Sequence, residues 1–237
     1  GLLKDRLELA RTNLDDALEK VKAIVENVAP PKDFFQYQRY FIGNPESKTD
    51  LETKEGIRHE FYKAVSSLVR AYANISTEME EAGYPTAMAE RIKSEVDYFQ
   101  GMKLDLQHAA NEYIELKQYE PDMRRLIDFH LSAENSRVIS DFENMGLIDL
   151  IVEQGIAATE KLSDNVRNNK EAMAETIENN VRRVIKKKKK TNPKYFAEMS
   201  ELLEDLIHRR RKKTIEYEDY LQKIVELSRK VKQSDNG

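Results

Sequence analysis

The sequence contains no cysteine and no tryptophan among its 237 residues. Without cysteine the chain has no disulfide, no thiolate metal ligand and no cysteine nucleophile, and we expect a reducing, cytoplasmic setting. Glycine and proline are scarce, with 8 and 6 residues, which argues against a strand-rich or disordered protein. Together with 35% charged residues, these absences predict long helices with charged outer faces.

Long hydrophobic runs are also absent. No apolar stretch approaches the roughly 18 residues that a membrane span needs, and the start of the chain, GLLKDRLELARTNLDD, is too charged for a signal peptide. We therefore expect no membrane contact. Because Gly1 stands where an initiator Met is expected, we also expect this chain to be a fragment of a longer protein.

Motifs for catalysis and nucleotide binding are missing. The sequence has no GxSxG turn for a nucleophile and no GxxxxGK[ST] loop for phosphates. Pro121-Asp122 opens a predicted helix, whereas a nuclease of the Pro-Asp type places its acidic residues on strands. Each histidine stands alone on a different predicted element: His59, His108, His130 and His208. We therefore predict no catalytic, cofactor or metal site in this chain.

Apolar residues recur at intervals of three and four over long stretches, which is the pattern of amphipathic helices. The expected fold class is all-α, an elongated bundle of long antiparallel helices with short connectors. Gly83 and Pro85 suit a turn between an antiparallel pair. The long helices are predicted over residues 2–28, 50–82, 86–118, 157–190 and 193–232.

Three shorter segments lie between these helices. The aromatic run from Asp33 to Gly43 is either an exposed docking patch or a plug at one end of the bundle, and we favour the plug. A short helix is predicted from Asp122 to Leu131. The apolar patch from Leu147 to Val152 fits a buried strand and a helical turn equally well.

Charge divides the chain near residue 155. Residues 156–237 carry 20 Lys and Arg against 14 Asp and Glu, a net charge of +6, whereas residues 1–155 carry 19 against 29, a net charge of −10. We expect an N-terminal helical part (1–155) and a C-terminal helical part (156–237) within one continuous helical domain. The asymmetry suggests that the C-terminal part faces a polyanion or an acidic partner.

Two basic clusters are the main candidates for contact with DNA or a partner protein. Such clusters either neutralise phosphates or offset a helix dipole in solvent, and the sequence leaves both readings open. Their members are Arg182, Arg183, Lys186, Lys187, Lys188, Lys189 and Lys190, and then Arg209, Arg210, Arg211, Lys212 and Lys213.

Three motifs in the C-terminal part carry a resemblance. AETIENNVRRVI (174–185), TNPKYFAEMSELLEDLI (191–207) and YEDYLQKIVEL (217–227) resemble, in order and spacing, the C-terminal region of type I restriction-enzyme motor subunits. The segment EFYKAVSSLVRAYANI (60–75) and the patch at 147–152 are also similar to that region. None of the family's catalytic motifs is present, so the resemblance covers a helical, non-catalytic region alone.

The resemblance implies a parent subunit with an endonuclease domain and ATP- and Mg²⁺-dependent motor domains. It further implies that this helical region docks the motor onto the methyltransferase and specificity subunits in defence against foreign DNA. Side chains that suit docking anchors are Tyr195, Phe196, Arg210, Tyr217 and Tyr220. The alternatives are a nonspecific contact of the basic clusters with duplex DNA and a generic helical scaffold.

Overall fold

The computed structural model describes residues 1–233, so the end of the predicted C-terminal part, residues 234–237, lies outside the described residues. Within residues 1–233 every regular element is a helix, which confirms the all-α class. An elongated shape of the bundle stays a prediction. The elements are α1 (Leu2–Ile24), α2 (Phe34–Phe41), α3 (Asp50–Thr53), α4 (Glu55–Ala73), α5 (Thr86–Ala109), α6 (Tyr113–Lys117), α7 (Met123–His130), α8 (Ala133–Asp141), α9 (Leu147–Gln154), η1 (Gly155–Lys161), α10 (Asp164–Arg167), α11 (Lys170–Lys188), α12 (Pro193–Arg211) and α13 (Tyr217–Gln233). In this part of the chain no helix is both long enough and apolar enough to cross a lipid bilayer.

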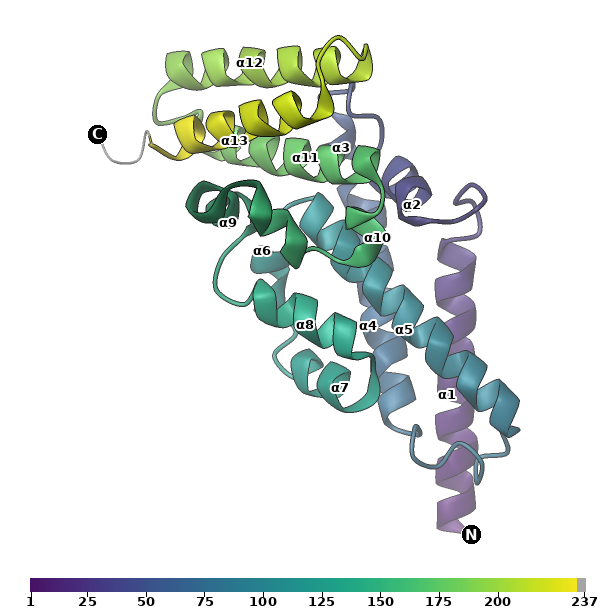
Figure 1. Cartoon of the computed structure of the whole chain (residues 1–237). Helices are drawn as coiled ribbons and strands as arrows, with labels where there is room; N and C mark the ends of the chain where they lie inside the picture. The colour runs from purple at the N-terminus through teal and green to yellow at the C-terminus, as the bar shows by residue number, and fades with distance from the viewer. Residues whose placement is uncertain (234–237) are drawn as a thin grey trace.

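Three long helices, α1, α4 and α5, support the N-terminal part. Leu7, Leu14, Leu18 and Val21 are spaced so that they form one buried seam along α1. This seam packs against α4, and α4 packs in turn against α5 with the opposite chain direction, as expected (Figure 1). The chain reverses between α4 and α5 through Gly83, whose φ of +90° is a left-handed conformation.

The aromatic run forms α2, which plugs the space between the N-terminal and C-terminal helices. Phe34, Tyr37 and Phe41 are all buried, and the helix contacts both α5 and α11. Asp33 caps α2 because its carboxylate accepts a hydrogen bond from the amide of Gln36. The interpretation as a packed plug is therefore confirmed.

The helix predicted over residues 157–190 is wrong as a single element. The structure has the 3₁₀ helix η1, the short α10 and then α11 in this range. Ser163 and Asn169 are in extended conformations before α10 and α11, and the Asn169 side chain accepts a hydrogen bond from the amide of Ala172. Asn169 therefore caps α11, whereas the Ser163 hydroxyl donates to the Asp105 carboxylate at 2.7 Å instead of capping α10. The apolar patch 147–152 is helical and forms most of α9.

Three other predicted helices are also interrupted. The helix expected over 86–118 breaks at Asn111 (φ +58°), and the helix expected over 193–232 breaks at Lys213 (φ +55°). A left-handed residue cannot continue a right-handed helix, and asparagine tolerates this conformation well. The helix expected over 50–82 ends at Ala73, and hydrogen-bonded turns follow up to Gly83.

The C-terminal part is a layer of three neighbouring helices, α11, α12 and α13 (Figure 1). Asn192 caps α12 through a hydrogen bond from the Tyr195 amide, and Pro193 occupies the first turn, as the sequence predicts. Helix α11 also contacts α2 and α5, and α13 contacts α9. One cluster of buried side chains extends from Leu14 to Val231. The division of the chain near residue 155 stays a prediction.

Candidate interaction surface on the C-terminal helices

Helix α11 is the inner helix of the C-terminal layer and is buried along most of its length. Its buried residues include five polar ones: Glu175, Thr176, Glu178, Asn179 and Asn180. Burying a polar group costs free energy unless the group is hydrogen-bonded. The hydrogen-bond partners of these side chains therefore show which neighbouring helices are attached to α11.

Glu178 is fully buried and joins all three helices of the layer. Arg210 of α12 donates to its carboxylate from Nε at 3.0 Å and from Nη2 at 2.9 Å, and the Tyr220 hydroxyl of α13 donates at 2.8 Å. Burial raises the pKa of Glu178, and the Arg210 guanidinium opposes this rise. The bidentate pair fixes the relative position of α11 and α12, and Tyr220 adds α13 to the same group.

Glu175, Thr176 and Asn180 attach α11 to α2 and α5. The Glu175 carboxylate pairs with Arg39, and burial raises its pKa to about 7 in spite of that partner. Gln38 donates to the Thr176 hydroxyl at 3.1 Å, and Asn180 donates to the backbone carbonyl of His108 at 2.6 Å. The motif ETIENN therefore positions the C-terminal layer on the rest of the chain.

The residues predicted as docking anchors lie at two depths. Phe196 and Tyr220 are buried, with 1% and 0% of their surface exposed, and Arg210 is nearly so. Tyr195 and Tyr217 are partly exposed, and their hydroxyls donate to the carbonyls of Lys230 (2.7 Å) and Lys170 (3.4 Å). Phe196, Tyr220 and Arg210 thus pack the layer internally, and of the five only the two outer tyrosines present much surface to another subunit.

The first basic cluster lies at the C-terminal end of α11, and most of its charges are paired within the chain. The pairs are Arg182 with Glu204 (2.9 Å), Arg183 with Glu112 (3.2 Å), Lys186 with Glu52, and Lys187 with Glu115. Lys188 donates to the carbonyl of Val231 at 3.3 Å. Lys189 and Lys190 are exposed at the turn into α12.

The second basic cluster lies at the opposite end of α12. Arg211 pairs with Glu46 at 3.3 Å, and Arg209 lies 3.8 Å from Asp205. Lys212 and Lys213 are exposed. The 19 residues of α12 span about 28 Å at 1.5 Å per residue, so the lysines at the end of α11 lie far from the second cluster. Arg182 and Arg211 come closer to each other, because Arg182 donates to the carbonyl of Pro45 and Arg211 pairs with Glu46.

A shallow groove lies between α12 and α13. It has a volume of about 140 Å³ and is lined by Leu202, Asp205, Leu206, Arg209, Lys223, Glu226, Leu227 and Lys230. Leu202 is 44% exposed, although it is a large apolar side chain. We call this feature the α12–α13 groove; it combines an apolar floor with a rim of both charge signs.

A further buried carboxylate, Glu112, lies between α5 and α6 and joins α4 to α11. Arg58 donates to it from Nε at 3.0 Å and Nη2 at 2.5 Å, Arg183 donates at 3.2 Å, and the Tyr62 hydroxyl donates at 2.8 Å. Glu112 could not be predicted as a site residue from the sequence, because Arg58 and Arg183 lie 54 and 71 positions away from it. No local motif indicates such a pairing.

Glu112 also takes part in a group of metal-type ligands. Among the described residues, Glu55, His59 and Glu112 bring three candidate ligand atoms within 4.8 Å of one another. His59 Nε2 lies 3.7 Å from Glu55 and 3.9 Å from Glu112. A cation there would compete with the guanidiniums of Arg58 and Arg183 for the Glu112 carboxylate, so we assign no metal to this group.

The comparisons with known proteins identify one family. A family model described as "Type I restriction enzyme HindI endonuclease subunit-like, C-terminal" matches residues 5–237. No curated protein and no solved structure matches the chain. The match covers nearly the whole chain, including the three motifs between residues 174 and 227.

Proposed function

Because the chain belongs to the family of C-terminal domains of type I restriction enzyme HindI endonuclease subunit-like proteins, we propose that it is an assembly module. In this proposal it docks an ATP-dependent DNA translocase and endonuclease subunit onto the methyltransferase and specificity subunits. The complex would cleave foreign DNA, with ATP and Mg²⁺ bound by other domains of the subunit. No residue of this chain is assigned a catalytic role.

The observation that supports docking over DNA contact is the internal pairing of the basic clusters. Arg182, Arg183, Lys186, Lys187, Arg209, Arg210 and Arg211 each have a carboxylate of the same chain within 4.0 Å. A phosphate would have to displace these carboxylates before it gained a counter-charge. The net attraction for DNA is therefore much smaller than the number of lysines and arginines in the sequence suggests.

We propose the α12–α13 groove as the docking surface. Its exposed Leu202 provides an apolar contact, while its mixed rim of Asp205, Glu226, Arg209 and Lys223 provides polar contacts without a single dominant sign. Tyr195 lies beside the groove, because its hydroxyl bonds to the carbonyl of Lys230. The charged residues of the groove are two acidic and three basic, so their net charge is small and salt screening is expected to change the affinity for a protein partner much less than the affinity for DNA.

The alternative, nonspecific contact with duplex DNA, rests on the four exposed lysines of the clusters that have no carboxylate partner among residues 1–233: Lys189, Lys190, Lys212 and Lys213. Four phosphate contacts give a salt slope near −4, so a tenfold rise in salt would weaken DNA binding by more than about 10³-fold. The salt dependence of binding therefore separates the two functions.

The experiment titrates the purified chain against the assembled methyltransferase–specificity core, and separately against duplex DNA, at low and high salt. We expect core binding at both salts, and Leu202→Glu is expected to weaken it at least tenfold because a carboxylate would enter the apolar part of the interface. Leu9→Glu, a substitution of another exposed leucine on the distant α1, is the matched control.

A variant with all four exposed lysines changed to glutamine tests the alternative. If DNA binding disappears in this variant and core binding is absent in the unmodified chain, the docking proposal is wrong and the DNA-contact function replaces it. Core binding that is unchanged by Leu202→Glu would reject the α12–α13 groove as the surface while leaving docking itself in place.

A further inference from the structure

Helix α5 carries a polar stripe where a buried face is normally apolar. Gln100, Lys103, Leu104 and Gln107 lie at spacings of three, one and three, so they share one face of the helix. All four are buried, with exposed fractions of 1%, 1%, 3% and 4%. Two carboxamides and an ammonium group are thus held inside the protein along two turns of helix.

The Lys103 ammonium has its own partners, but the two carboxamides do not. Lys103 donates to both carboxylate oxygens of Glu120, at 2.8 and 2.7 Å, and to the Ser66 hydroxyl at 2.5 Å. In contrast, within residues 1–233 neither Gln100 nor Gln107 makes a side-chain hydrogen bond, and Gln100 Oε1 is a buried acceptor without a donor. A buried unsatisfied group of this kind costs about 1–3 kcal/mol.

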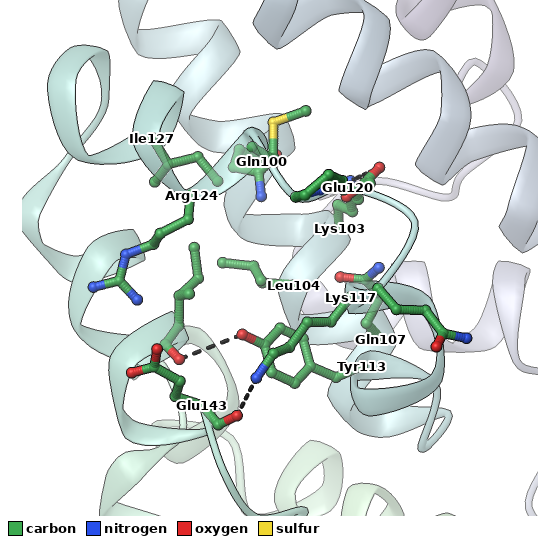
Figure 2. A pocket seen from close by; sticks show the side chains of 14 residues that line it. Gln100, Lys103, Leu104, Gln107, Tyr113, Lys117, Glu120, Arg124, Ile127 and Glu143 are labelled. Atoms are coloured by element: carbon green, nitrogen blue, oxygen red, sulfur yellow. Dashed lines mark hydrogen bonds and ion pairs between the residues drawn. The ribbon is translucent and has the colours of Figure 1, made fainter.

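Both carboxamides line a pocket of about 320 Å³ between α5, α6, α7 and α8 (Figure 2). Leu104 lies between them in the view, and the aliphatic side chains of Ile127 and Ile139 and the ring of Tyr113 supply apolar wall. The Tyr113 hydroxyl is already used, because it donates to the Ile139 carbonyl at 3.3 Å. The two glutamines of α5 therefore supply the free hydrogen-bonding capacity in the buried part of the pocket, while Gln118 is exposed at its edge.

The cationic side chains that line the pocket are engaged elsewhere. Lys117 donates to the backbone carbonyl of Glu143, a contact drawn in Figure 2, and Arg124 forms an ion pair with Asp128 at 2.9 Å. Lys103 is neutralised by Glu120. An anionic ligand would thus find no unpaired cation, and a fully apolar ligand would leave both carboxamides unsatisfied.

A neutral, planar molecule with hydrogen-bonding edges and apolar faces fits a pocket that has no unpaired cation for an anion and that holds carboxamides in need of hydrogen-bond partners. Each glutamine offers two N–H donors and one carbonyl acceptor, which is the complement that glutamine uses towards the edge of a nucleobase. The pocket volume is at the lower end of the range for small-molecule sites, which suits a single heterocycle. We propose that this pocket binds a nucleobase-type heterocycle through Gln100 and Gln107.

The test measures binding of the free bases adenine, cytosine, uracil and hypoxanthine to the whole chain by ligand-observed NMR. At least one base is expected to bind with a Kd of about 1 mM or tighter, the range of a ligand of this size. Gln100→Leu and Gln107→Leu should each weaken that binding at least tenfold. Gln222→Leu, on the exposed face of α13, is the matched control and should leave it unchanged.

Thermal unfolding without ligand separates this role from a purely structural one. Because the carboxamides lack partners, Gln100→Leu is expected to keep or raise the Tm of the free chain, and only base binding should be lost. The proposal is overturned if no base binds at concentrations up to about 10 mM. It is also overturned if binding persists in both variants, or if Gln100→Leu lowers the Tm of the unliganded chain while the bases bind it as before.

Discussion

Removing Arg210 should destabilise the whole chain, because it leaves the Glu178 carboxylate buried without its counter-charge. Glu178 is fully buried and receives two hydrogen bonds from Arg210, at 3.0 and 2.9 Å. Breaking a buried pair of this kind by removing one partner costs about 3–5 kcal/mol. Arg210→Met keeps most of the aliphatic volume, so the loss reports mainly the uncompensated charge.

The assay is urea unfolding followed by circular dichroism, together with Tm. For a chain of this size, a loss of about 3–5 kcal/mol lowers the Tm by on the order of 10 °C. The double variant Glu178→Gln/Arg210→Met removes the charge and keeps an acceptor for the Tyr220 hydroxyl, so it should recover about 2 kcal/mol or more. The deficit of Arg210→Met alone should also shrink as pH falls, because burial raises the pKa of Glu178 and protonation neutralises it.

Two results would refute this reasoning. If Arg210→Met lowers the free energy of unfolding by less than about 1 kcal/mol, the Glu178–Arg210 pair contributes no more than an exposed ion pair does. Equal stability of Arg210→Met and the double variant would show that the buried charge is not the cause of the loss. Either result would remove the main support for a pre-organised layer of α11, α12 and α13.

Three further predictions follow from buried groups and backbone geometry. Burial raises the pKa of Asp105 to about 7, so the folded chain holds a proton that the unfolded chain releases near pH 4, and stability falls as pH rises between these values. Asp105→Asn has no carboxyl to titrate, so its free energy of unfolding should not carry this pH dependence. Measured by urea unfolding, the free energy of unfolding of Asp105→Asn minus that of the unmodified chain should increase by about 2 kcal/mol between about pH 5.5 and pH 8. A difference that stays constant with pH would contradict the raised pKa of Asp105. Glu112→Gln should cost about 2–4 kcal/mol in the same assay, since Arg58 is then buried without a carboxylate, and a cost near zero would mean that this guanidinium is solvated. Gly83→Ala should lower the Tm by a few degrees, because φ is +90° there and a Cβ would lie 2.6 Å from the Arg11 guanidinium; an unchanged Tm would argue against this turn.

The sequence predicts the helical class and the start of several helices, but not where long helices break. The apolar spacing of α1 and the Asn192-Pro193 start of α12 are local signals, and both are confirmed. The interruptions at Asn111 and Lys213 are not predicted. Lysine rarely adopts a φ of +55°, and the exposed Lys213 does so in a turn that is closed by the hydrogen bond from the Thr214 amide to the Arg209 carbonyl. The apolar periodicity predicted one long helix in stretches that the structure divides into separate helices.

The sequence also identifies important side chains of the C-terminal layer without revealing which way they face. Arg210 follows Leu203 by seven positions and Ile207 by three, and Tyr220 precedes Ile224 by four, so each is in phase with a buried face. That phase was the available signal that Arg210 and Tyr220 lie inside the layer. Their partner Glu178 lies 32 and 42 positions away, and no local pattern predicts that contact.

The pocket beside α5 could not be predicted from sequence at all. Gln100 and Gln107 look like ordinary surface residues of a charged helix, and only the packing of α6, α7 and α8 over them makes them buried. The lack of a donor for Gln100 Oε1 among the described residues is a property of the folded chain. Unsatisfied buried groups are therefore a structural signal with no counterpart in composition or spacing.

Competition for assembly tests the docking function most directly. The isolated chain is added in excess to the methyltransferase–specificity core, the full-length endonuclease subunit is then added, and its recruitment is measured by size-exclusion chromatography at high salt. The docking account predicts that the chain blocks recruitment and that Leu202→Glu does not. Full recruitment in the presence of saturating unmodified chain would contradict the account.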